Sequence, residues 1–147
     1  MRVRQFRSEF WLARPPVELF PFFADATNLE TLTPQWLRFR IVTPRPIEMR
    51  EGTSIDYHLR IHGLPVRWRS RINVWEPPHR FVDEQIRGPY RLWIHEHKFA
   101  ERDGGTEVRD RVQYSAPGGA LVDALFVRRD LEKIFAYRRN KLKEVFA

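Results

Sequence analysis

Apolar and polar residues alternate along much of the chain, with the two-residue period of a β-strand. Residues 3–12 alternate in this way, and from Trp36 to Tyr114 the pattern is one strand after another. Turn residues, among them the dipeptide Asp103-Gly104, separate these segments. The pattern therefore predicts a first strand, followed later in the chain by a run of six antiparallel strands.

Three segments have helical spacing instead. The run VELFPFFAD, residues 17–25, predicts a compact apolar helix that Pro21 is expected to distort, and residues 28–32 fit a second short helical turn. From about Ala120 to Phe146, apolar residues recur every three or four positions with basic residues between them. One long amphipathic helix is therefore expected to close the chain.

The strand pairing can be predicted because neighbouring strands must turn their apolar residues to the same face. Turns at residues 62–65, 76–79 and 103–104 give the pairs Tyr57/Ser70, Leu59/Trp68, Val74/Phe81, Ile72/Asp83, His97/Asp110 and His95/Val112. The resulting inner face is mostly apolar and consists of Ile55, Tyr57, Leu59, Ile61, Trp68, Ile72, Val74, Phe81, Trp93, Phe99, Val108 and Val112. The opposite face carries charged residues, as a solvated face should.

The same inner face carries a group of polar residues on three adjacent strands, namely Asp83, Gln85, His95, His97 and Asp110. Two histidines with a carboxylate could supply two nitrogens and one oxygen to a metal ion, but no further ligand is identified, and we expect no metal. A carboxylate beside a histidine also suits acid/base chemistry, because it fixes the tautomer and raises the basicity of the ring. The third interpretation is a structural cluster of mutually bonded side chains. We expect at least one histidine to remain open to a ligand.

Composition and charge narrow the choice of function. The chain has 147 residues, the size of one domain (residues 1–147), and it has no cysteine and no apolar N-terminal run, so we expect a cytoplasmic protein. No apolar stretch is long enough to span a bilayer, which leaves only peripheral membrane contact open. The net charge is +7, but the arginines are interleaved with acids, which argues against a nucleic-acid partner. The basic residues of the C-terminal segment, Arg128, Arg129, Arg138, Arg139, Lys141 and Lys143, are expected to be solvated.

Several segments resemble the START-like superfamily, also called SRPBCC, in its ligand-binding bacterial branch. They are PPVELF at residues 15–20, NLE at 28–30, LTP at 32–34, FVDEQIRGPYRLWIHEHKF at 81–99 and GGTEVRDRVQYSAPGG at 104–119. The resemblance implies an α+β helix-grip fold: a curved antiparallel sheet of six to seven strands wrapped around the long C-terminal helix, with two short helices after the first strand. It also implies a cavity between the sheet and that helix.

Members of the superfamily include lipid carriers and aromatic polyketide cyclases or dehydratases, so two functions stay open. The first is binding of a hydrophobic or aromatic small molecule or lipid without a cofactor; the second is a cyclase, dehydratase or isomerase. The candidate catalytic residues are His95, His97, Asp110 and Asp83. The expected ligand-binding residues are Tyr57, Trp68, Ser70, Phe81, Asp83, Gln85, Trp93, His95, His97, Asp110, Val112 and Tyr114. A protein-docking role is a third interpretation, and the oligomeric state is not predicted.

Overall fold

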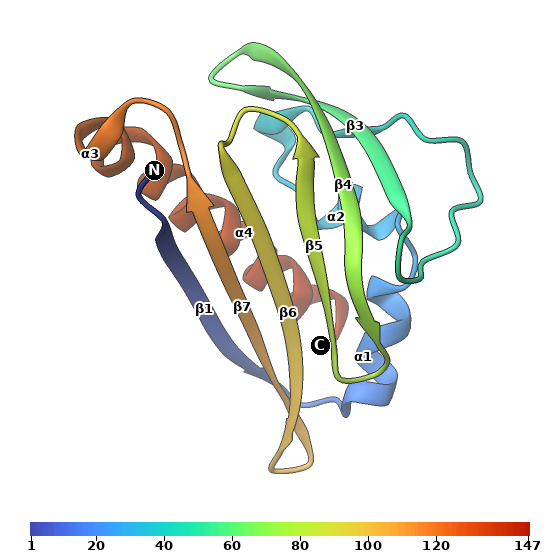
Figure 1. The fold of residues 1–147 in the computed structure, drawn as a ribbon. Coiled ribbons are helices and arrows are strands. Elements are labelled where there is room, and N and C mark those ends of the chain that lie inside the picture. Colours follow the sequence, from blue (N-terminus) through green and yellow to red (C-terminus); the bar gives the residue numbers. More distant parts are fainter.

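A single antiparallel sheet forms the framework of the protein in the computed structural model, which describes all 147 residues. Its strands are β1 (Arg4–Leu12), β2 (Arg40–Ile41), β3 (Ser54–Ile61), β4 (Leu64–Glu76), β5 (Arg80–Arg87), β6 (Leu92–Arg102) and β7 (Gly105–Ser115). They are arranged in the order β1-β7-β6-β5-β4-β3-β2 (Figure 1). The curved sheet and the expected six-strand run after the first helices are confirmed.

The helices lie on one face of this sheet (Figure 1). They are α1 (Pro16–Phe23), α2 (Asn28–Leu32), the 3₁₀ turn η1 (Gln35–Leu37), α3 (Gly119–Val122), the π-helical segment η2 (Asp123–Val127) and α4 (Arg128–Val145). The C-terminal helix thus contains a π-helical segment that the periodicity did not reveal. Trp36 belongs to η1 and not to a strand, and residues 42–53 contain no strand, which corrects the expectation of continuous strands from Trp36. No helix is long and apolar enough to cross a membrane.

The predicted registers are correct for one hairpin and need correction in two. In β6 and β7, His97 lies opposite Asp110 as expected. In β3 and β4 the turn has two residues, because His62 and Gly63 adopt φ values of 50° and 79°, as a tight hairpin turn requires. Tyr57 therefore lies opposite Trp68 and not Ser70. The shift is two residues, so every side chain keeps its predicted face.

A β-bulge between Ile72 and Val74 changes the faces at the end of β4. Beyond the bulge, Trp75 lies opposite Phe81, and the centroids of their rings are 5.5 Å apart. The sequence pattern predicted Val74 on the inner face opposite Phe81, and Trp75 takes this position instead. Before the bulge, Ile72 lies opposite Asp83, as predicted.

The core occupies the space between the inner face and the helices. The largest apolar cluster joins Leu19, Phe20 and Phe23 of α1 to Phe99 of β6 and Leu142 of α4. Toward the other end of the sheet, the aromatic residues Tyr57, Trp68, Tyr90 and Trp93 face Leu131 and Phe135 of α4. That second end contains the cavity.

Candidate functional site

The cavity lies between the inner face of the sheet and α4, where the resemblance implied it. It has a volume of about 190 Å³ and is lined by 25 residues, of which 18 are hydrophobic. The helix α4 contributes Leu131, Ile134 and Phe135, which face the strands across the cavity. An apolar cavity of about 150 Å³ is large enough to bind benzene. The space thus suits an organic molecule with an aromatic or aliphatic body.

Most of the expected ligand-binding residues lie at this cavity. Eight of them are part of its lining: Tyr57, Trp68, Ser70, Phe81, Asp83, Trp93, His95 and His97. The other four, Gln85, Asp110, Val112 and Tyr114, are not. Asp110 is 2% exposed and does not reach the cavity, but its carboxylate accepts a hydrogen bond from the lining residue His95.

The remaining three expected residues have other partners. Gln85 uses both ends of its amide in the turn after β5, where it accepts from the backbone N–H of Tyr90 and donates to its carbonyl. Val112 is fully buried in a second apolar cluster with Phe135. The hydroxyl of Tyr114, also in that cluster, donates to Asp123 at 2.7 Å. Alternation places these residues on the inner face, but it does not show that helix side chains cover Val112 and Tyr114 or that Gln85 is bonded within its own turn.

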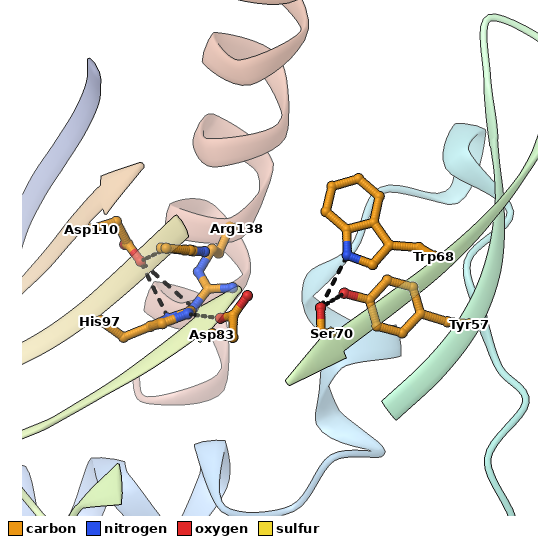
Figure 2. Close-up of polar contacts among 8 residues, drawn as sticks. Tyr57, Trp68, Ser70, Asp83, His97, Asp110 and Arg138 are labelled. Atoms are coloured by element: carbon orange, nitrogen blue, oxygen red, sulfur yellow. Dashed lines mark hydrogen bonds and ion pairs between the residues drawn. The ribbon is translucent and has the colours of Figure 1, made fainter. Parts of the chain in front are cut away.

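His97 is held at both ring nitrogens. Its Nδ1 lies 3.1 Å from Nη2 of Arg138, and its Nε2 lies 2.7 Å from Oδ2 of Asp83 (Figure 2). A guanidinium can only donate, so Nδ1 accepts, and the ring proton is on Nε2, which donates to Asp83. Burial lowers the pKa of His97 well below its ordinary value, with further lowering from the neighbouring His95 and Arg138. His97 is therefore a neutral ring with a fixed tautomer.

His95 is held at one nitrogen only. Its Nε2 donates to Oδ1 of Asp110 at 2.7 Å, and its ring stacks on that of His97 with centroids 3.6 Å apart. Its Nδ1 has no partner in the chain and is not among the fully buried polar atoms. The two histidines thus differ: His97 is fully engaged, whereas His95 keeps one nitrogen free at the cavity.

Arg138 is the functional candidate that the sequence pattern assigned to solvent, and the structure corrects that prediction. Its side chain is 10% exposed, and it enters the cavity from α4 between His97 and Asp110, whose Oδ1 lies 3.8 Å from Nη2. A signal for this placement existed in the sequence. Arg138 follows Leu131 by seven residues, at the spacing that keeps side chains on one helical face.

The two aspartates of the cluster experience opposite effects. For Asp110, burial would raise the pKa, but Arg138 and the hydrogen bond from His95 outweigh it and bring the pKa to about 2. For Asp83, burial dominates and raises the pKa above its ordinary value. Asp110 Oδ2 and Arg138 Nε are buried without any partner in the chain. Such groups cost about 1–3 kcal/mol each, so the fold tolerates a cluster that is not optimised for stability.

A second polar group lies across the cavity from Asp83, on β3 and β4 (Figure 2). The indole N–H of Trp68 donates to Ser70 Oγ at 3.0 Å, and the hydroxyls of Ser70 and Tyr57 are 2.5 Å apart. These three side chains hold three donor hydrogens but share only two bonds. One hydroxyl hydrogen therefore remains for another acceptor, whichever hydroxyl donates to the other.

Metal binding can be judged from the ring geometry. Asp83, His95 and His97 place one possible ligand atom each within 4.8 Å of one another. However, the two imidazoles are nearly parallel, with 26° between their planes. Two stacked rings lie in nearly parallel planes, so one ion close to both rings cannot lie in both planes unless a ring rotates. The arrangement favours hydrogen bonding, and the absence of stoichiometric metal stays a prediction for elemental analysis.

Comparison with known proteins agrees with this architecture. Residues 12–142 match the family described as polyketide cyclase / dehydrase and lipid transport. The chain belongs to this family. Its membership confirms the START-like resemblance suggested by the sequence. Among curated proteins, no sequence matches the chain.

Solved structures show the same fold at low sequence identity. Protein CV1439 from Chromobacterium violaceum is 14% identical with a TM-score of 0.75, and the match covers 97% of this chain and 96% of that one. Ginseng major latex-like protein 151 from Panax ginseng is 7% identical with a TM-score of 0.72, over 98% and 97% of the two chains. Protein Ms6760 from Mycobacterium smegmatis is 16% identical with a TM-score of 0.69, over 99% and 96%. The helix-grip fold is thereby confirmed.

Proposed function

We propose that the protein binds a hydrophobic or aromatic small molecule in the cavity between the sheet and α4. The observation that carries this proposal is the presence of unused polar groups at an otherwise apolar cavity. Asp83 Oδ1 and His95 Nδ1 lack partners in the chain without being fully buried, and the Tyr57/Ser70 pair retains a hydroxyl hydrogen. Ligand sites combine apolar walls with a few polar groups of this kind.

The arrangement favours a ligand with an apolar body and two polar functions. A hydroxyl of the ligand would donate to Asp83 or His95, and a carbonyl or ether oxygen would accept from Tyr57 or Ser70. Trp68 and Tyr57 both line the cavity, where their rings stack with centroids 6.0 Å apart and provide aromatic contacts for such a body. A hydrophobic small molecule or lipid is the expected partner, and the cytoplasm is the expected location of the protein.

Binding can be tested with the uncharged fluorescent probe N-phenyl-1-naphthylamine and with native mass spectrometry of freshly purified protein. The variant Ile134→Trp fills the cavity from α4, whereas Lys133→Trp places the same bulk on the exposed side of that helix. We expect the first variant to weaken probe binding by at least about tenfold, or 1.4 kcal/mol, and the second to bind as the wild type does. Equal binding by both variants would place the probe elsewhere.

A second function, proton transfer on the bound molecule, is favoured by the surroundings of Asp83. His97 holds Oδ2 of this carboxylate in place, Oδ1 stays free, and burial raises the pKa of the group, which strengthens it as a base. In such a step Asp83 takes a proton from the carbon between two carbonyls, and the one free hydroxyl hydrogen of the Tyr57/Ser70 pair stabilises the enolate oxygen. The protonated Asp83 then returns the proton to a ligand carbon or oxygen.

Hydrogen–deuterium exchange at that carbon, followed by NMR with a 1,3-diketone such as benzoylacetone, distinguishes the two functions. An enzyme would accelerate exchange, and Asp83→Asn would abolish the acceleration while retaining the probe-binding site. No acceleration by the wild type, with normal probe binding, would leave binding alone as the function.

A further inference from the structure

The charge at the cavity is opposite to the charge of the protein. The whole chain carries a net charge of +7. The charged residues that line the cavity are Asp83, Asp130 and Arg138, two acids and one base. Asp110 lies directly behind the lining, with its Oδ1 3.8 Å from Arg138. A ligand inside the cavity therefore encounters more negative than positive charge, although it approaches a positive protein.

Asp83 is the acid that a ligand would meet. Its only ion-pair contact within 4.0 Å is with His97, at 2.7 Å. His97 is neutral, since its Nδ1 accepts from Arg138 and burial lowers its pKa. The hydrogen bond from His97 positions Asp83 but brings no positive charge. Asp83 thus faces the cavity with no cationic partner of its own, and its Oδ1 is available to a ligand.

Arg138 is poorly placed to compensate by binding an anion. Its Nη2 is used by His97, and its Nε is buried without access to a ligand. The remaining donors are those of Nη1 and the second hydrogen of Nη2, and Nη2 already lies 3.8 Å from Oδ1 of Asp110. An anion that bound to Nη2 would therefore lie near the carboxylate of Asp110.

We propose that Asp83 makes this cavity selective by charge: it accepts uncharged ligands that carry a hydroxyl and excludes carboxylates of the same shape. The inference rests on the proposed binding function and adds a rule about its ligand. A hydroxyl donates its hydrogen to Asp83 Oδ1, whereas a carboxylate has no hydrogen to donate and repels it. Uncharged phenols and alcohols are thus the ligand class, and fatty or aromatic acids are not.

The test compares 2-naphthol, 2-naphthoate and the cation 2-naphthylmethylammonium by calorimetry at pH 7.5. These probes share one ring system and differ in the charge of the head group. The wild type should bind the naphthol at least about tenfold more tightly than the naphthoate, since juxtaposed like charges cost several kcal/mol. The cation should also bind more tightly than the naphthoate. The reverse order would mean that the net charge of +7 governs binding, and it would overturn the rule.

Two variants identify the responsible carboxylate. Asp83→Asn removes the cavity charge and supplies an amide donor, so naphthoate affinity should rise by about tenfold or more. Glu84→Gln makes the same charge change one residue along β5, where the carboxylate accepts from Arg71 instead of facing the cavity. It should leave the selectivity unchanged. Equal shifts in both variants would overturn the role of Asp83.

The possible failures can be told apart. Should Asp83→Asn not fold, the order of the three probes on the wild type still decides the rule. Binding of N-phenyl-1-naphthylamine together with equal affinities for naphthol and naphthoate would overturn the charge rule and leave the binding function standing. Failure of the wild type to bind any of these compounds would overturn both proposals.

Discussion

At one end of the inner face, Phe20 and Phe23 of α1 fill the space between sheet and helix, with ring centroids 5.5 and 4.8 Å from that of Phe99. At the other end, Tyr57 and Trp68 line a cavity of about 190 Å³. Both ends are rich in aromatic residues. They differ because Leu19 and Phe20 of α1 pack into the first end without lining the cavity, whereas the helix side chains at the second end, among them Ile134 and Phe135 of α4, leave a space between themselves and the strands. Aromatic content on one face of a sheet therefore predicts a binding cavity only when the opposing layer is known.

Truncation of one ring at each end should give the largest contrast. Phe20→Ala, in the packed end, should lower the free energy of unfolding by about 3–5 kcal/mol and leave the affinity for the uncharged probe unchanged. Phe39→Ala, at the cavity lining, should lower the free energy of unfolding by less than about 2 kcal/mol and should weaken the binding of the probe. Urea unfolding and probe titration measure both effects. Equal losses of stability would contradict the distinction between the two ends.

The buried charges between the two ends should give the next largest effect. Asp110→Ala leaves Arg138 without its nearest carboxylate and the Nε2–H of His95 without an acceptor, so a loss of about 3–5 kcal/mol is expected. Removing Arg138 as well, by Arg138→Met, should recover part of this loss. On the exposed face, Glu84→Ala breaks the ion pair with Arg71 and should cost less than about 1 kcal/mol. Similar losses at the two positions would show that the cluster is not desolvated.

The pH dependence of stability gives a smaller and graded effect. The pKa of His97 is lowered from its ordinary value of 6.5, so the unfolded chain binds this proton more readily. Stability should fall as the pH drops below 6.5, by up to about 1.4 kcal/mol per pH unit. Asp110, with its pKa at about 2, adds a loss below its ordinary value of 3.8. Asp83 opposes these losses as the pH falls through its raised pKa.

The variant His97→Gln removes the first of these titrations. Chemical unfolding at pH 7.0, 6.0 and 5.0 should show a flatter profile for the variant than for the wild type. An unchanged profile would mean that His97 is not buried as a neutral ring.

The sequence predicted the inner face well because alternation along a strand determines the face of each residue. It placed His97 opposite Asp110 and put Asp83 and His95 on the same face. It did not predict the bulge after Ile72, since a bulge depends on local backbone geometry that leaves little trace in the pattern.

The contribution of the helices was harder to predict. Arg138 looked like one of several solvated basic residues, and its role depends on the rotation of α4 against the sheet. Leu131 and Phe135 define that rotation, and together with Arg138 they form one face of the helix. Gln85 illustrates the opposite error, since it shares the predicted face but is bonded within its own turn. Pattern alone gives the face of a residue, and contacts from other elements decide its partner.

The most direct test of the proposed binding site is a crystal structure of the protein with 2-naphthol. We predict electron density for the ring system between β3–β6 and α4, against Tyr57 and Trp68, with the ligand hydroxyl within hydrogen-bond distance of Asp83 or His95. Density only on the outer face of the sheet, or an empty cavity in crystals of protein that binds the probe in solution, would contradict it.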